Sequence, residues 1–194
     1  NVLPQARIDK ARALYQEHKA LLDRIAKQYD VPAKYIVALW GMESSFGANM
    51  GNFSVIESLA TLAYEGRRAD FFKDELIKAL RILQEQGMDS SQLIGSWAGA
   101  MGQCQFMPSS YHKFAVDGDG DGKKDIWGSQ ADVFASIANY LHSSGWKGEQ
   151  SWGREVRLPA NFDRSLENIE SFRPLSEWKK LGVTRVDGSP LPAV

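Results

Sequence analysis

Ala33-Lys-Tyr-Ile-Val-Ala-Leu-Trp-Gly-Met-Glu-Ser-Ser-Phe-Gly47 is the stretch that decides the fold. Its apolar side chains and one acid follow the i, i+3, i+4, i+7 spacing of a single helix face: Ile36, Leu39, Trp40 and Glu43. A carboxylate on the face that enters the core is costly unless it is paired or protonated. The negative end of the helix dipole near Gly47 also favours the protonated form. Glu43 is therefore either a buried structural acid or the general acid of an active site.

Length and composition restrict the kind of protein. The 194 residues are enough for one large domain or two small ones. The 23 basic and 24 acidic residues nearly balance, which argues against general electrostatic binding to nucleic acid or to an anionic membrane. A single cysteine excludes an intrachain disulfide framework. No apolar run approaches the roughly 20 residues of a membrane span. No targeting signal is present, so the chain is expected to be cytoplasmic or to have lost a leader.

Hydrophobic periodicity and capping residues predict a mainly α-helical protein. Ser54 and Ser129 have the spacing of N-caps, and Gly87 and Gly145 that of helix stops. The expected helices cover residues 4–29, 32–43, 54–65, 70–86, 91–97, 108–115, 129–142 and 174–181, with a short strand at 154–158. We expect a helical domain over residues 1–147, with an EF-hand-like loop inserted at 116–132. Residues 148–194 are expected to form a loop-rich C-terminal segment that is truncated.

A second informative stretch is Gly95-Ser-Trp-Ala-Gly-Ala-Met-Gly-Gln-Cys-Gln-Phe-Met-Pro-Ser-Ser-Tyr111. Gln103 and Gln105 alternate with Cys104 and Phe106, so an extended backbone would point both amides to one side. A glutamine amide both donates and accepts hydrogen bonds, which suits sugar hydroxyls and acetamido groups but supplies no nucleophile. Taken alone, a loop of this kind more often connects helices than binds a ligand.

Other catalytic chemistries have weaker support. His18, His112 and His142 are scattered without the spacing of metal ligands. Cys104 has no neighbour in sequence that would activate a thiolate, so a nucleophilic Cys–His pair is disfavoured. No Gly-x-Ser-x-Gly elbow and no phosphate-binding loop is present.

A third stretch, Asp117-Gly-Asp-Gly-Asp-Gly-Lys-Lys-Asp-Ile-Trp-Gly128, matches the beginning of a calcium loop. Acids occupy positions 1, 3 and 5 and glycine occupies position 6. Position 12 is Gly128 where the bidentate glutamate should be; Asp125 at position 9 could help to bind an ion, and Asp132 in the next helix could close a longer loop. Three carboxylates this close repel one another without a counter-ion, which favours a bound Ca²⁺ over an acidic surface turn.

Glu43-Ser-Ser-Phe-Gly47, the stretch from Ser96 to Ser110, the acidic loop and Ala138-Asn-Tyr-Leu141 together resemble the lytic transglycosylase B family of bacterial cell-wall enzymes. The resemblance runs from about residue 4 to residue 190. It implies a lysozyme-like helical catalytic domain that cleaves the MurNAc–GlcNAc β-1,4 bond of peptidoglycan. The product would carry a 1,6-anhydro-MurNAc end, formed without water.

The same resemblance assigns roles to individual residues. It makes Glu43 the single catalytic acid and base, with Ser96 hydrogen-bonded near it. It places Gln105, and Gln103 with it, against the substrate, beside Tyr140 in the wall of the site and Met101 and Phe106 in the groove. The implied Ca²⁺ is structural, without an organic cofactor, and its expected ligands are Asp117, Asp119, Asp121, the Lys123 carbonyl and Asp132, with Asp125 as the other candidate.

One carboxylate is unusual for a glycosidase, since hydrolytic enzymes commonly use two. With a single acid, the 2-acetamido oxygen of the substrate must attack the anomeric carbon. Two alternatives stay open: a lysozyme-type peptidoglycan hydrolase, and a non-catalytic glycan-binding domain stabilised by calcium. The expected partners are peptidoglycan strands and proteins of cell-wall synthesis or remodelling, with no nucleic acid. We expect a periplasmic monomer, either soluble or held at the outer membrane as a lipoprotein.

Overall fold

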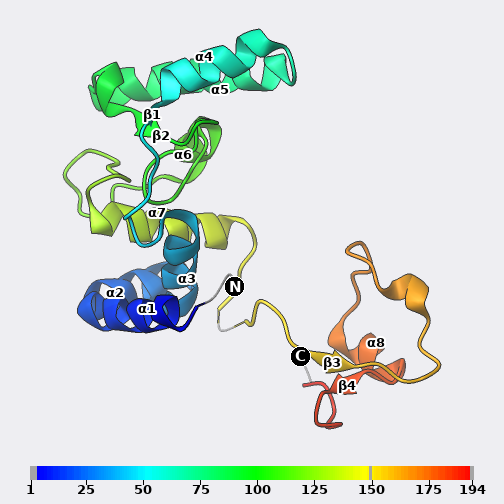
Figure 1. Ribbon diagram of the computed structural model, residues 1–194. Helices are drawn as coiled ribbons and strands as arrows, with labels where there is room; N and C mark the ends of the chain where they lie inside the picture. Colours follow the sequence, from blue (N-terminus) through cyan, green and yellow to red (C-terminus); the bar gives the residue numbers. More distant parts are fainter. Residues whose placement is uncertain (1–3, 149, 193–194) are drawn as a thin grey trace. The chain divides into compact units, whose positions relative to one another are not determined.

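The computed structural model describes residues 4–148 and 150–192 (Figure 1). The chain divides into two compact units, residues 1–149 and residues 150–194. Eight α-helices and four short strands form in the described residues. The prediction of a mainly helical protein is therefore confirmed.

The first unit stacks its helices in layers between a helix pair at one end and a helical hairpin at the other (Figure 1). α1 and α2 form one end and contact α3, which in turn packs on α7. α6 links α7 to α5, and α4 and α5 pack along each other as the hairpin. The bounds are α1 Gln5–Glu17, α2 Lys19–Tyr29, α3 Ala33–Ser44, α4 Val55–Glu65, α5 Ala69–Gln86, α6 Pro108–Phe114 and α7 Gln130–Ser143. Strands β1 (Phe53–Ser54) and β2 (Ile94–Gly95) pair antiparallel between the layers.

The core of this unit is continuous from α2 to α5. Trp40 of α3 is its largest fully buried side chain, and its ring meets Phe134 of α7 edge to face, with 5.0 Å between the centroids. Other buried members come from every layer: Leu22, Ile25, Ile36, Leu59, Ile82, Leu93, Met101, Tyr111, Ile126 and Val133. The burial of this set removes apolar surface from water, which is the main force that holds the layers together.

Two predicted elements are wrong. The helix expected over residues 4–29 is broken at His18, whose backbone (φ −98°, ψ 14°) separates α1 from α2 while its ring packs on Trp40 and Phe134. The helix expected over residues 91–97 is a 3₁₀ turn, Ser90–Gln92, followed by β2. Pairing with β1 extends this segment, because cross-strand hydrogen bonds outweigh a weak helix preference.

Both predicted N-caps are confirmed. The side chain of Ser54 accepts from the backbone N–H of Glu57, and that of Ser129 accepts from the N–H of Asp132. Each hydroxyl satisfies one of the backbone donors that a helix leaves free in its first turn.

The second unit contains η2 (Arg164–Leu166), α8 (Leu175–Lys180) and the antiparallel pair of β3 (Val156–Arg157) with β4 (Thr184–Arg185). The predicted helix at 174–181 is confirmed, and the predicted strand at 154–158 is present in shorter form. Phe162 stacks on Trp178 beside an apolar cavity of about 510 Å³. Among the helices described here, none has both the length and the apolar composition needed to cross a membrane.

Candidate active site

Glu43 lies on the last turn of α3, whose C-terminal end reaches the middle layer of the first unit (Figure 1). The expectation that its side chain enters the core is wrong, because Glu43 is exposed. The buried face of α3 is rotated from the predicted one, so that it excludes Glu43. Its members are Ile36, Val37, Trp40, Gly41 and Ser44. Glu43 thus lies beside the buried face of α3 and not within it.

The carboxyl group of Glu43 is isolated. In the part of the chain that the structure describes, it has neither a hydrogen-bond partner nor an ion-pair partner. The surrounding protein atoms partly withdraw it from water, and this desolvation raises the pKa of Glu43 above its ordinary value. No second carboxylate contributes to that shift. The arrangement provides one acid that holds its proton to higher pH than an ordinary glutamate does.

The turn after α3 is tightly restrained. Ser45, Phe46 and Gly47 all have positive φ (51°, 62° and 79°), which is ordinary for glycine but unusual for Ser45 and Phe46. The hydroxyl of Ser44 accepts from the N–H of Gly47, and the carbonyl of Ser44 accepts from the N–H of Asn49. The chain therefore leaves Glu43 in one defined direction.

Ser96 lies in a turn that packs against the chain following α3. A Cβ on Gly51 would lie 2.1 Å from the Gly95 carbonyl oxygen and 2.7 Å from the Ser96 nitrogen. Ser96 Oγ accepts from the N–H of Ala98 and of Ala100, at 3.3 and 3.0 Å. Its hydroxyl proton remains available to another acceptor, and no hydrogen bond joins Ser96 to Glu43 within the described residues.

The two glutamines of the next loop point to different places. An extended backbone was expected, but Met101 and Phe106 form a bridge that closes a tight turn, in which Gln105 has φ 50°. Gln105 Nε2 donates to the carbonyls of Met50 and Gly102, and its Oε1 has no partner among the described residues. Gln105 can therefore accept a hydrogen bond from a ligand.

Gln103, in contrast, is turned into the protein and is 5% exposed. Its Oε1 accepts from Trp40 Nε1 at 2.7 Å, and its Nε2 donates to the Trp127 carbonyl at 2.8 Å. The expectation that Gln103 contacts substrate beside Gln105 conflicts with this placement, because its amide is buried and bonded to the protein.

Met101 was also expected to line the groove but is fully buried in the core. Phe106 is 7% exposed, and its ring lies 5.9 Å from that of Tyr140. Tyr140 is 38% exposed and also packs on Phe114. Of this aromatic cluster, Tyr140 offers the accessible face, and Phe106 supports it from below.

Cys104 is buried, and its thiol lies 3.6 Å from the Val133 carbonyl oxygen. Burial raises the pKa of the Cys104 thiol far above its usual value, and the negative charges of Glu43 and Asp132 add to that effect. A thiolate is therefore strongly disfavoured at this position, which removes the Cys–His alternative.

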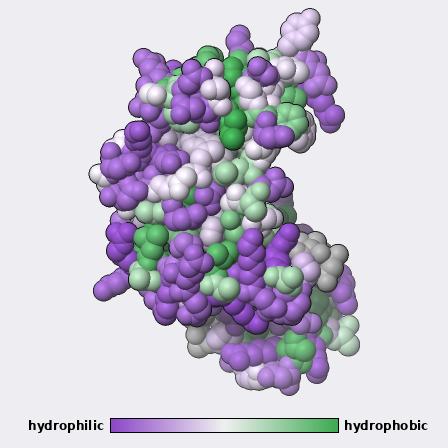
Figure 2. Space-filling view, turned by 60° about the vertical axis from the view of Figure 1, so that its left-hand side comes forward, coloured by the Kyte–Doolittle hydropathy of each residue, from purple (hydrophilic) through white to green (hydrophobic). Residues whose placement is uncertain are grey.

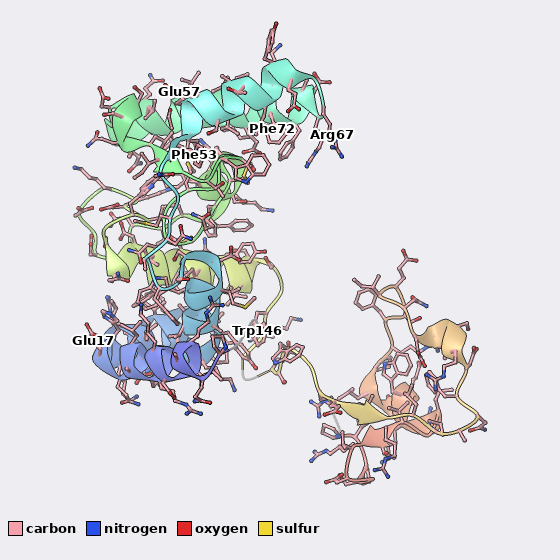
Figure 3. The ribbon with its side chains drawn as sticks, in the orientation of Figure 1. Glu17, Phe53, Glu57, Arg67, Phe72 and Trp146 are labelled. Atoms are coloured by element: carbon pink, nitrogen blue, oxygen red, sulfur yellow. The ribbon has the colours of Figure 1, made fainter. Side chains whose placement is uncertain are left out.

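A basic turn that the sequence analysis missed joins α4 to α5. Arg67 and Arg68 are exposed, and the Arg68 guanidinium lies over the Phe71 ring at 4.3 Å from its centroid. Figure 3 shows Arg67 and Phe72 on the side of the hairpin that faces the rest of the first unit. Figure 2 shows a hollow beneath the hairpin. The two adjacent arginines after Gly66 can be read from the sequence as a pair of positive charges at a turn.

The acidic loop brings three carboxylates together. One oxygen from each of Asp117, Asp119 and Asp121 lies within 4.8 Å of the other two. The N–H of Gly122 donates to Asp117 at 2.8 Å, and this bond, with others from the loop backbone, lowers the pKa of Asp117. Oxygen atoms gathered in this way are the donor set that hard divalent cations prefer.

Asp125 and Asp132 accept hydrogen bonds from the backbone of the loop, and their role as calcium ligands stays a prediction. Asp132 is fully buried, and its two oxygens accept from the N–H of Gly118 and of Asp125 at 2.7 and 2.6 Å. Asp125 Oδ1 accepts from the N–H of Trp127 and of Gly128. Asp132 thus closes the loop by bonding its two ends, and Asp125 begins the turn into α7.

Comparison with known proteins gives a consistent picture. The sequence matches the family described as Transglycosylase SLT domain over residues 1–194. It is 41% identical over 186 residues to Membrane-bound lytic murein transglycosylase B of Escherichia coli (strain K12), covering 89% of this chain and 51% of that protein. The chain thus spans about half the length of that relative.

Solved structures of lytic transglycosylases resemble this chain over most of its length, as two of them show. SltB3 from Pseudomonas aeruginosa, in complex with NAG-anhNAM-pentapeptide, superposes with a TM-score of 0.95 at 52% identity and covers 99% of this chain and 51% of its own. The Escherichia coli lytic transglycosylase Slt35, in complex with calcium, gives a TM-score of 0.84 at 32% identity, covering 94% of this chain and 58% of its own. The lysozyme-like helical fold expected from the sequence is that of these lytic transglycosylases.

Proposed function

Because the chain belongs to the family of transglycosylase SLT domains, we propose that it cleaves the MurNAc–GlcNAc β-1,4 bond of peptidoglycan and leaves a 1,6-anhydro-MurNAc end. The observation that carries this proposal is the isolation of Glu43, a single acid with a raised pKa and no second carboxylate acting on it. A hydrolase of the ordinary kind needs two carboxylates on either side of the scissile bond. A single acid fits a reaction in which the substrate supplies its own nucleophiles.

In the first step, protonated Glu43 donates its proton to the glycosidic oxygen, and the C1–O bond breaks. The carbonyl oxygen of the MurNAc 2-acetamido group forms a bond to C1, which gives an oxazolinium ion. The GlcNAc portion leaves with a new C4 hydroxyl, and Glu43 is left as the carboxylate.

In the second step, the Glu43 carboxylate accepts the proton of the MurNAc C6 hydroxyl. The C6 oxygen attacks C1, the oxazolinium ring opens and the 1,6-anhydro ring closes. Glu43 is protonated again, so substrate and products balance without water. The same group serves as acid and then as base, which requires a pKa near the working pH.

The surrounding residues bind and orient the sugar. Gln105 Oε1 accepts from a sugar hydroxyl or acetamido N–H, and the exposed face of Tyr140 packs on a sugar ring. Ser96 orients the sugar or the carboxyl group of Glu43 through its hydroxyl proton. Arg67 and Arg68 bind carboxylates of the peptide stem, because a guanidinium is planar and pairs well with carboxylates. We assign this machinery to residues 1–147.

The test is mass spectrometry of purified peptidoglycan after incubation with the chain. Muropeptides lighter by one water molecule than hydrolysis products are expected. Hydrated reducing ends would instead establish a lysozyme-type hydrolase. Binding of glycan strands without cleavage would establish a non-catalytic domain.

The pH dependence of turnover tests the role of Glu43 as an acid. The protonated fraction of Glu43 falls as pH rises through its pKa, and desolvation places that pKa above the ordinary glutamate value. The alkaline limb of kcat/KM is therefore expected at higher pH than for an unperturbed glutamate. If the alkaline limb of kcat/KM lay at the ordinary glutamate pKa, the assignment of Glu43 as a desolvated general acid would be contradicted.

We also propose that Asp117, Asp119 and Asp121 bind a structural Ca²⁺ with the Lys123 carbonyl. The donor set fits, since one oxygen from each of the three carboxylates lies within 4.8 Å of the other two, and carboxylate oxygens are the ligands that Ca²⁺ prefers. Asp125 and Asp132 support the loop through its backbone in this proposal. A bound ion would hold the segment between α6 and α7, and it takes no part in the chemistry at Glu43.

Removal of calcium is expected to lower the thermal unfolding midpoint. A ligand at about 100 times its Kd stabilises by about 2.7 kcal/mol, which corresponds to about 5–10 °C for a chain of this size. Differential scanning calorimetry with EDTA, followed by added Ca²⁺ or Mg²⁺, measures the effect. Asp121→Ala should abolish the response and Asp187→Ala, in an exposed turn of the second unit, should retain it. Equal midpoints with and without EDTA would contradict the site.

Peptidoglycan in Gram-negative bacteria lies in the periplasm, so we propose that location for the activity. The proposed partners are glycan strands that carry peptide stems, consistent with the ligand of the SltB3 structure. Partners among cell-wall proteins and a monomeric state stay predictions.

A further inference from the structure

The buried side chain of Gln103 contacts the chain both before and after Glu43. On the helix side, its Oε1 accepts from Trp40 Nε1 at 2.7 Å, and Trp40 precedes Glu43 by one turn. On the other side, Gly47 packs directly on the same amide: a Cβ on Gly47 would lie 2.5 Å from Gln103 Oε1. Glu43 therefore lies between two points that one side chain holds.

Gln103 is itself firmly anchored. Its backbone N–H donates to the Ile126 carbonyl at 2.9 Å, and its Nε2 donates to the Trp127 carbonyl at 2.8 Å. Both partners belong to the segment that leads from the acidic loop into α7. The amide thus transmits the position of that segment to the end of α3.

The hydrogen bond from Trp40 Nε1 to Gln103 restrains the indole ring in addition to its packing. The rings of His18, Phe46 and Phe134 surround Trp40 edge to face at 5.0 to 5.9 Å between centroids. Edge-to-face contacts have a preferred geometry of their own, and the hydrogen bond adds a directional restraint at one atom, the indole nitrogen. The indole N–H bond to Gln103 therefore ties the last turns of α3, which carry Glu43, to the loop that holds Gln103.

We propose that Gln103 is a positioning residue for Glu43, acting through Trp40 and Gly47 without contact with substrate. This inference rests on the proposed function. It assigns to Gln103 a role that differs from substrate binding by Gln105 in the same turn. In this proposal Gln103 positions Glu43, and Gln105 binds the substrate.

Gln103→Met tests the role, because methionine keeps the shape and removes the hydrogen bonds. We expect kcat to fall by about 10- to 100-fold, the cost of a misplaced catalytic group, with KM changed by less than about threefold. The indole N–H of Trp40, followed by NMR, should exchange faster with solvent. A KM that rises while kcat is unchanged would instead mean substrate binding and would overturn the proposal.

Gln130→Met is the matched control. Gln130 Nε2 donates a long hydrogen bond of 3.4 Å to Gln103 Oε1, and Gln130 Oε1 is buried with no partner among the described residues, so the substitution removes only that long bond. We expect kcat within about twofold of the native chain. An equal loss of kcat in Gln103→Met and Gln130→Met would overturn the proposal, because general loosening would explain both.

Trp40→Phe approaches the same contact from the other side and serves if Gln103→Met does not fold. A kcat loss of at least about 10-fold with KM preserved is expected, and the Trp40→Phe, Gln103→Met double variant should lose little more than either single variant. Full kcat in Trp40→Phe would overturn the proposal. A native chain that forms no anhydro product would refute the proposed function separately, since the Trp40 exchange rate does not depend on activity.

Discussion

Replacement of Glu43 by Gln is expected to reduce the formation of 1,6-anhydro ends by about 10²- to 10⁴-fold, the usual cost of losing a general acid. The amide occupies the same space but can neither donate the proton to the leaving oxygen nor accept one from the C6 hydroxyl. Both steps of the proposed mechanism lose their proton carrier. Mass spectrometry of digested peptidoglycan measures the loss directly.

Glu57→Gln is the control for this change. Glu57 is an exposed glutamate in the first turn of α4, and its backbone, not its carboxylate, makes the hydrogen bonds to Ser54 and Thr61. The same chemical substitution there should leave turnover unchanged. Residual turnover above about 1% in Glu43→Gln would contradict the assignment, because a general acid contributes at least about 100-fold.

The Glu43→Gln variant should also fold at least as well as the native chain. Folding raises the pKa of Glu43, so this carboxyl stabilises the fold at low pH and loses that contribution as pH rises through the folded pKa. Above that pH the desolvated carboxylate costs stability, which the neutral amide does not. A thermal unfolding midpoint at neutral pH equal to or above that of the native chain is expected, which separates lost chemistry from lost structure.

Local signals in the sequence predicted most of the fold. Ser54 and Ser129 begin helices where their spacing indicated, and Gly87 and Gly145 follow the ends of α5 and α7. The break at His18 carried no local signal, because it is due to packing of that ring on two aromatic residues from other helices. Tertiary contacts of this kind override helix propensity.

The site was predicted less completely than the fold. Glu43 stood out by its spacing, but a small rotation of the buried stripe of α3 leaves it exposed. The alternation of Gln103 and Gln105 assumed an extended chain, whereas the turn gives Gln105 a positive φ and sends the two amides apart. Met101 is core because it lies on the inner side of the same turn. Long-range packing, which periodicity does not report, decides all three.

Gly51→Ala is expected to destabilise the first unit by about 3–5 kcal/mol, the sum of a strained backbone and a forced overlap. Gly51 has φ +84°, and its Cβ would lie 2.1 Å from the backbone oxygen of Gly95. Neither backbone can move without opening the β1–β2 pair or the turn at Ser96. Differential scanning calorimetry measures the lowered midpoint, and anhydro-product formation should fall with it.

Gly145→Ala separates the two causes. Gly145 has a comparable φ of +97°, but nothing lies within 4 Å of the position of its Cβ. Backbone strain alone should cost about 1–2 kcal/mol there. The excess in Gly51→Ala then measures the overlap with Gly95. If the two variants lost equal stability, the contact between the chain after α3 and the Ser96 turn would be loose, and the hydrogen bonds of Ser44 and Gln105 would have to hold that chain in place instead.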